Sequence, residues 1–157
     1  MTKYPITPEG LKKLQEEFKR LKSIERPKVI EAIAEARGHG DISENAEYDA
    51  AKEQQAFLEK KIRDLENKIA NADVVDPSAM STERVVFGLQ VKVQDLDSGE
   101  EISYQIVGVD EADIAKQRIS ISSPVARSLI GKTVGDIVQV QIPRGLRELE
   151  ILDISNP

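Results

Sequence analysis

Two apolar stripes in the first half of the chain mirror each other, and this symmetry constrains the fold more than any other feature. The first stripe recurs at helical spacing, and the second is spaced 4-3-4-3, which is typical of a coiled-coil seam. Taken in antiparallel order, the facing members have position numbers that sum to 83: Leu11 with Ala72, Leu14 with Ile69, Phe18 with Leu65, and Leu21 with Ile62. The sequence therefore predicts an antiparallel helical hairpin with its midpoint between Asp41 and Ile42.

Local signals mark the start of the first helix and an interruption within it. Residues 7–9 combine an N-cap hydroxyl, a proline at the first helical position and an acid in the first turn. Pro27 is expected to kink or break the helix, because it lacks an N–H and its ring clashes with the preceding turn. Beyond Leu21 the apolar face is expected to continue through three residues: Ile24 (opposite Leu58, with a sum of 82), Ile30 and Ile33.

The second half of the chain changes from helical to alternating periodicity. Short alternating apolar segments separated by turn residues predict strands at 85–87, 89–93, 102–106, 118–122, 138–142 and 149–154. Ser123 and Pro124 open a short helix at 125–130. We therefore expect an α+β chain of two domains, with a coiled-coil hairpin at 1–76, a linker at 77–83, and a small, mostly antiparallel sheet with one short helix at 84–157.

Composition excludes several classes of function. The chain has no cysteine, which rules out disulfides, thiolate metal sites and cysteine nucleophiles. Its net charge of −6 argues against autonomous, sequence-specific binding of nucleic acid, because phosphate contacts need basic clusters. Neither a signal peptide nor an apolar run of about 18 residues is visible, so we expect a cytoplasmic protein without membrane contact. Phosphate-binding glycine loops, nucleophile elbows and histidine metal motifs are also missing from the sequence.

The predicted turn at 38–48 carries the one cluster of residues that suggests chemistry. Asp41 and Glu44 lie three positions apart, so at a helix start their carboxylates project from one end and one side. One interpretation is structural, because the two residues also form a capping box for the second helix. The other is a site for Mg²⁺, which often takes only one or two protein carboxylates. A solvated tip would hold the ion weakly, so this interpretation requires a second protein that already holds a metal and phosphates.

Other polar residues surround the acidic pair. Arg37 and Lys52 flank it on the two helices, where they either balance its charge or contact RNA. Asn45 and Tyr48 either orient the turn or pack against it. The sequence leaves these alternatives open.

Several motifs, in order and in both halves of the chain, resemble a bacterial Gre-type transcript cleavage factor, and the match is closest to the GreA branch. They are IAEAR at 33–37, HGDISENAEYDAAKEQQ at 39–55, FG at 87–88, ISSPVARSLIGK at 121–132 and GD at 135–136. The GreB branch shows a larger basic patch along the coil. Residues 1–78 carry 14 basic and 16 acidic side chains, which does not suggest such a patch.

The resemblance implies a C-terminal domain similar to the FKBP fold and a transcription elongation factor that binds RNA polymerase. The coiled-coil tip would enter the secondary channel and stimulate the polymerase's own Mg-dependent cleavage of backtracked RNA, so the chain itself would not be an enzyme. The nascent RNA 3′ end would be a partner in the complex. Matching positions are Asp41 and Glu44 for a Mg²⁺ shared only when docked, Ser122, Ser123 and Pro124 for the channel rim, and Arg37, Asn45, Tyr48 and Lys52 for polymerase or RNA contact.

Three other functions compete with this one. A Gre-like inhibitor would occupy the same channel without cleavage, although the presence of both Asp41 and Glu44 argues against it. A peptidyl-prolyl isomerase would need an aromatic pocket, and the second domain offers only Phe87 and Tyr104. A coiled-coil adaptor without chemistry would tolerate replacement of both acids.

Overall fold

The structure of the chain is a computed structural model that describes residues 3–39 and 45–157. Its contacts divide the chain into two compact units. The helical unit is Leu11–Ala72, and the sheet unit combines Thr2–Gly10 with Asp73–Pro157. The predicted first domain, 1–76, includes the N-terminal segment that the contacts group with the sheet unit. A helical hairpin and a small sheet confirm the predicted α+β class.

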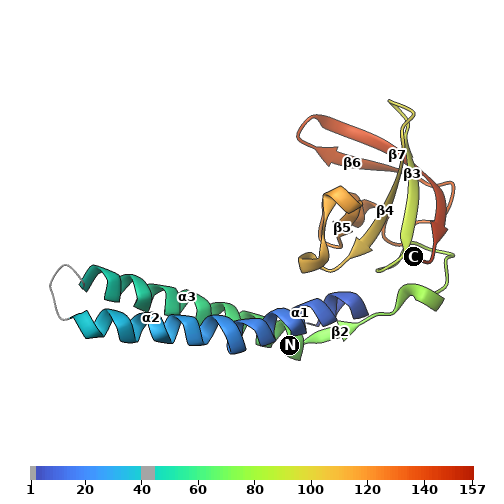
Figure 1. The fold of residues 1–157 in the computed structure, drawn as a ribbon. Coiled ribbons are helices and arrows are strands. Elements are labelled where there is room, and N and C mark those ends of the chain that lie inside the picture. Colours follow the sequence, from blue (N-terminus) through green and yellow to red (C-terminus); the bar gives the residue numbers. More distant parts are fainter. Residues whose placement is uncertain (1–2, 40–44) are drawn as a thin grey trace. The chain divides into compact units, whose positions relative to one another are not determined.

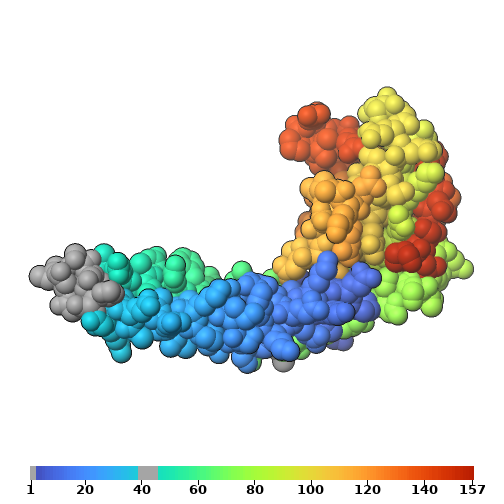
Figure 2. All heavy atoms as spheres, viewed as in Figure 1, coloured from blue at the N-terminus to red at the C-terminus, as the bar shows by residue number. Residues whose placement is uncertain are grey.

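The hairpin is built from α1 (Pro8–Arg20), a π turn (Leu21–Glu25), α2 (Arg26–His39) and α3 (Asn45–Ala70). α1 begins as predicted, because Thr7 Oγ1 accepts a hydrogen bond from the Gly10 N–H at 3.1 Å and caps the helix. α2 packs along α3, and Figures 1 and 2 show these two arms side by side. The described part of the chain therefore has the predicted antiparallel hairpin.

Of the predicted kink or break at Pro27, the break does not occur, although a π turn interrupts the regular α-helix just before the proline. In a regular α-helix its ring would meet the carbonyl of Ser23, and its nitrogen has no hydrogen to donate. The backbone relieves this conflict with the π turn just before it, where the Arg26 N–H donates to the carbonyl of Leu21, five residues back. The helix continues through Pro27 because the turn holds one extra residue.

The predicted seam is confirmed on one side of the π turn and is partly wrong on the other. On the confirmed side, the buried core is Leu21, Ile62 and Leu65, with Leu14, Phe18 and Leu58 packed around it. Ile24 within the turn and Ile30 beyond it are 49% and 52% exposed, so they do not continue the apolar face. One extra residue rotates the following helix by about 100°. Ile33 remains buried, and Ala36 is buried as well.

The sheet unit contains a five-stranded sheet of order β5-β4-β3-β7-β6. Its elements are β3 (Gln90–Asp95), β4 (Glu101–Val107), β5 (Arg118–Ser120), α4 (Pro124–Leu129), β6 (Ile137–Ile142) and β7 (Gly145–Ser155). Neighbouring strands are antiparallel except β4 and β5, which run parallel. This matches the predicted, mostly antiparallel sheet with one short helix (Figure 1).

The core of the sheet unit is apolar and continuous. It includes Leu89, Val91 and Val93, and Leu129 of α4 is buried with them. The predicted strand at 85–87 is wrong, because this segment lies outside the strands. The apolar residues of segment 85–87 reflect burial in the core of the sheet unit instead. Val85 is buried, and its backbone bonds to Gly131 and Lys132 after α4.

Several smaller elements were not predicted. β1 (Tyr4–Ile6) and β2 (Ala72–Val74) form a two-stranded sheet, and short 3₁₀ turns lie at Pro77–Ala79, Val109–Glu111 and Ile114–Lys116. Across the residues that the structure describes, every helix is too short or too polar to cross a membrane.

Candidate functional site

The predicted acidic pair, Asp41 and Glu44, lies outside the described residues, as does the predicted start of the second helix. The structure describes the two helix ends on either side of segment 40–44. α2 ends at His39, and α3 begins at Asn45. The assignment of Mg²⁺ to the acidic pair stays a prediction, and so does the role of the Asn45 side chain.

Arg37 and Tyr48 meet across the hairpin close to this segment. The Arg37 guanidinium carbon lies 5.6 Å from the centroid of the Tyr48 ring. Arg37 Nη2 also donates a hydrogen bond to the Tyr48 hydroxyl at 3.3 Å. That bond and the charge of Arg37 lower the pKa of Tyr48, because both favour the phenolate. The structure therefore brings two of the predicted contact residues together.

Lys52 completes a basic cluster around the phenol. It follows Tyr48 by four residues on α3, which places both side chains on one face of the helix. Its Nζ donates to Gln55 Oε1 at 3.3 Å, and its charge also lowers the pKa of Tyr48. We name these residues the Arg37–Tyr48–Lys52 cluster. It puts two cations beside segment 40–44, which carries Asp41 and Glu44.

An ion pair also joins the two arms of the hairpin, farther along the helices from segment 40–44 than this cluster. Arg26 Nε and Nη2 each donate to a carboxylate oxygen of Glu59 at 2.8 Å, so the pair is bidentate. The hydrogen bond from Arg26 holds the pKa of Glu59 below its usual range. This pair was not predicted from the sequence. Positions 26 and 59 sum to 85, as do 37 and 48, whereas the predicted seam pairs at 83.

In the sheet unit, the predicted contact residues Ser122, Ser123 and Pro124 form a rigid loop that leads into α4. Ser123 Oγ accepts the Ala126 N–H at 3.2 Å, and Pro124 occupies the first turn. Ser122 is held by the Ser120 hydroxyl, which accepts the Ser122 N–H at 3.1 Å and lies 2.7 Å from its Oγ. Local hydrogen bonds therefore hold the backbone of this loop, and its contact with a partner stays a prediction.

A buried carboxylate that the sequence analysis missed ties the N-terminal segment to the sheet unit. The Glu111 side chain is 4% exposed and accepts hydrogen bonds from Thr7 Oγ1, from the Thr7 N–H at 3.1 Å and from the Gly108 N–H at 2.9 Å. Arg118 Nη2 lies 3.6 Å from the same carboxylate. Gly10 is the available sequence signal, since a Cβ there would overlap Glu111.

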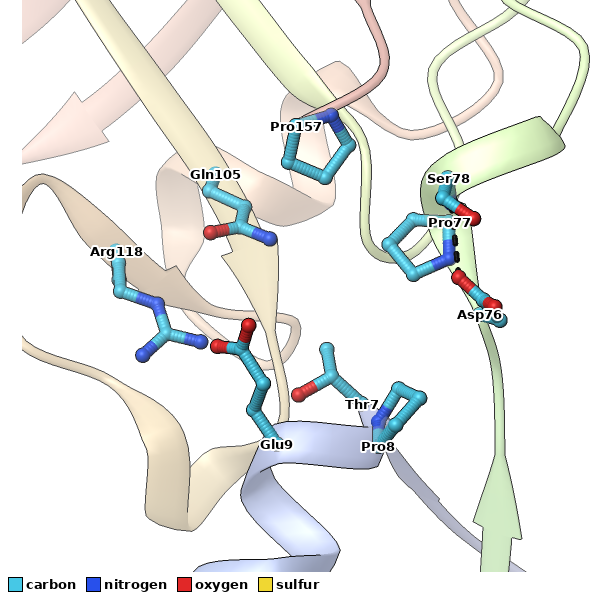
Figure 3. Close-up of a pocket in the computed structure, with 9 residues that line it drawn as sticks. All are labelled: Thr7, Pro8, Glu9, Asp76, Pro77, Ser78, Gln105, Arg118 and Pro157. Carbon is cyan, nitrogen blue, oxygen red and sulfur yellow. Dashed lines mark hydrogen bonds between the residues drawn. The ribbon is translucent and has the colours of Figure 1, made fainter.

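The sheet unit also holds a cavity of about 350 Å³, shown in Figure 3. Polar side chains and proline rings share its lining: Thr7, Pro8, Glu9, Asp76, Pro77, Ser78, Gln105, Arg118 and Pro157. None of these residues is aromatic. The cavity therefore lacks the aromatic lining that a peptidyl-prolyl isomerase pocket would need.

The described residues alone do not assemble a metal site. Within 3–39 and 45–157, no three histidine or acidic side chains converge closely enough to hold an ion. The candidate site of the helical unit is therefore the Arg37–Tyr48–Lys52 cluster with the acidic segment beside it.

Comparison with known proteins covers both halves of the chain. Residues 4–74 match the model of the N-terminal domain of the GreA/GreB transcription elongation factors, and residues 80–156 match the model of their C-terminal domain. Transcription elongation factor GreA of Alkalilimnicola ehrlichii is 55% identical over 155 residues, covering 98% of each chain. GreA of Methylococcus capsulatus is 54% identical, again over 98% of each chain.

Among solved structures, GreA factor homolog 1 of Thermus thermophilus aligns over 99% of this chain and 100% of its own, with 27% identity and a TM-score of 0.46. The sequence matches establish the relationship without that alignment. The chain belongs to the GreA/GreB family of transcription elongation factors.

Proposed function

We propose that this chain binds backtracked RNA polymerase, inserts its hairpin through the secondary channel and stimulates the polymerase's own cleavage of the extruded RNA. The observation that carries the proposal is the Arg37–Tyr48–Lys52 cluster, which puts two cations on the hairpin ends that flank Asp41 and Glu44. The chain belongs to a family of elongation factors, so we assign the cations of this tip to RNA phosphates and its acids to a metal ion.

The tip carries too few ligands to hold Mg²⁺ tightly, and this determines how it would act. Asp41 and Glu44 would hold Mg²⁺, and two carboxylates hold this ion weakly unless substrate phosphates and a second protein add ligands. Asp41 and Glu44, together with the polymerase, would hold the ion where its charge would lower the pKa of a bound water and stabilise the leaving oxygen of a phosphodiester. The chain therefore acts only when docked, and it is not an enzyme by itself.

The cations have a separate task in this proposal. Arg37 and Lys52 contact the negatively charged RNA backbone and draw the 3′ segment toward the acids. Asn45 and Tyr48 support that contact at the start of α3. We assign no independent nucleic-acid binding to the chain, because its net charge of −6 disfavours it.

The loop Ser122–Pro124 supplies a second contact, with the rim of the channel. Its backbone is fixed by the N-cap bond of Ser123 and by the Ser120 hydroxyl, so little ordering entropy is lost on docking. The C-terminal domain is, in this proposal, a docking module of FKBP-like fold that acts in the bacterial cytoplasm.

The test is a halted elongation complex with Mg²⁺, to which the chain is added and in which RNA shortening is measured. We expect the wild type to shorten the RNA and the double variant Asp41→Asn, Glu44→Gln to bind polymerase without cleavage. RNA with the chain alone is the control for nuclease activity. Undiminished cleavage by the double variant would refute the tip mechanism, and binding without cleavage by the wild type would favour the inhibitor alternative.

A further inference from the structure

The Arg37 guanidinium contacts both the ring and the hydroxyl group of Tyr48. Its guanidinium carbon lies 5.6 Å from the Tyr48 ring centroid, and its Nη2 donates to the Tyr48 hydroxyl at 3.3 Å. A long side chain that contacts a rigid ring in two ways has lost much of its rotamer freedom before a ligand arrives. The cost of ordering it on binding is lower for that reason.

Within the described residues, the contact with Tyr48 leaves most of the Arg37 guanidinium able to bind a ligand. Arginine has five N–H donors in a planar fork, and the bond to Tyr48 uses Nη2. Among residues 3–39 and 45–157, Tyr48 is the hydrogen-bond partner of Arg37, so within that part of the chain Nε and Nη1 keep their donors. Such a fork matches the oxygens of a phosphate or a carboxylate in bidentate geometry.

The neighbouring charge favours a polyanion over a single carboxylate. Lys52 lies on the same face of α3 as Tyr48, and both Lys52 and Arg37 lower the pKa of Tyr48. Two cations around one phenol suit a ligand with repeated negative charges. The backbone of RNA has this property, whereas one carboxylate side chain would satisfy one cation.

We propose that Tyr48 is a positioning residue that presents the Arg37 guanidinium to a phosphate of the nascent RNA. The inference rests on the proposed function and deepens it, because it assigns an orienting role to a residue that need not touch RNA. Tyr48 supplies no proton and contacts no reacting atom. It acts through Arg37.

Substitutions can separate the two contacts. Tyr48→Phe keeps the ring and loses the hydrogen bond, Tyr48→Leu loses both, and Arg37→Lys keeps the charge but loses the fork. The measurement is the RNA cleavage rate of halted complexes at saturating factor, together with the factor concentration that gives half of that rate. Phe57→Leu is the matched control, because Phe57 is an aromatic of the same helix that is 69% exposed.

We expect the saturated rate to fall about threefold for Tyr48→Phe and about tenfold each for Tyr48→Leu and Arg37→Lys, with half-saturation changed less than about twofold. Phe57→Leu should match the wild type. The double variant Tyr48→Leu, Arg37→Lys should be no slower than the slower single variant, because one residue acts through the other. A full rate for Tyr48→Leu, or a roughly hundredfold additive loss in the double variant, would overturn the proposal.

The ligand is identified by removing charge from the RNA. A neutral methylphosphonate linkage placed in the extruded segment should slow the wild type to the rate of Arg37→Gln, which has no charge at this position, and should leave that variant unaffected. If the wild type keeps its rate at every position of the neutral linkage, then Arg37 binds a carboxylate of the polymerase and the proposal is wrong.

A measurement without polymerase separates this inference from the proposed function. The ring carbon that bears the Tyr48 hydroxyl is followed by NMR through a pH titration, in the wild type and in Arg37→Gln. The pKa of Tyr48 should be below its ordinary value in the wild type and should rise in the variant. An unchanged titration overturns the contact and the inference with it. If the pKa of Tyr48 is lowered in the wild type and rises in Arg37→Gln as expected, but the wild type does not stimulate cleavage, then the proposed function is refuted and the contact is not.

Discussion

Gly10→Ala should destabilise the sheet unit although it improves helix propensity. Gly10 is the third residue of α1, and a Cβ there would overlap the carboxylate of Glu111. That carboxylate accepts the Thr7 N–H, as the third residue of a capping box usually does within one helix. Here a residue 104 positions away supplies it, so glycine leaves the space that Glu111 fills.

The magnitude follows from the bonds of Glu111. Moving the carboxylate away from a new methyl group weakens its bonds from Thr7 N, Thr7 Oγ1 and Gly108 N. A hydrogen bond to a charged group contributes about 1.5–3 kcal/mol, and the gain in helix propensity from glycine to alanine is at most about 1 kcal/mol. If two of these three bonds are lost, the cost of about 3–6 kcal/mol less about 1 kcal/mol of helix propensity leaves a net loss of about 2–5 kcal/mol.

Gly38→Ala is the matched control for this substitution. Gly38 also lies in a helix, but a Cβ there has open space around it, so we expect a gain of up to about 1 kcal/mol. Urea unfolding gives the free energies, and hydrogen exchange at the amides of Thr7, Gly10 and Gly108 shows whether the loss is local. In a Glu111→Ala background, Gly10→Ala should be nearly neutral or stabilising. If Gly10→Ala in the wild type is as stable as Gly38→Ala, the steric argument is wrong.

Three further predictions concern the hairpin and the sheet. Arg26→Ala should lower the unfolding free energy by a small but measurable amount, because the pair with Glu59 is bidentate but one third exposed, and 1 M NaCl should reduce the difference from the wild type. The N–H groups of Asp97 and Ser98, with Arg147, hold the pKa of Asp95 below its ordinary value of 3.8. The stability that Asp95 contributes is therefore present above about pH 4 and is lost as the pH falls through the pKa of the folded state. In urea unfolding at different pH values, Asp95→Asn should be less stable than the wild type at pH 7 and should approach it in acid. Deleting Ser23 removes the extra residue of the π turn and forces Pro27 into a regular helix, at a cost of about 3 kcal/mol in thermal unfolding. Adding Pro27→Ala to that deletion should restore most of the loss, and no recovery would mean that the proline is not the cause of the π turn.

Interactions within a few residues of each other could be predicted from the sequence. The Thr7 cap and the Ser123–Pro124 helix start are local, so the residue types are sufficient to identify them. The seam around Leu21 and Ile62 is not local, but its spacing repeats, and repetition made its pairing visible. The Tyr48 and Arg37 positions could also be named from their place beside the turn.

Contacts set by a single distant residue could not be predicted in this way. Glu111 lies 104 residues from Thr7, and one acidic residue in a loop gives no periodic signal. The strand predicted at 85–87 is wrong for a related reason. Val85 is apolar because the core around α4 buries it, and alternation over three residues does not distinguish that burial from a strand.

The π turn connects Pro27 with the candidate site. Before the turn, buried residues of the two arms pair at a sum of 83, as Leu21 and Ile62 do. Beyond it, the side-chain contacts between the arms pair at a sum of 85, as Arg26 with Glu59 and Arg37 with Tyr48 do. The sum therefore rises across the π turn, whose extra residue rotates α2 by about 100°. Without that rotation Ile30 would turn toward α3, and Arg37 would turn away from Tyr48. The local conflict at Pro27 therefore decides which side chains meet beside the acidic segment.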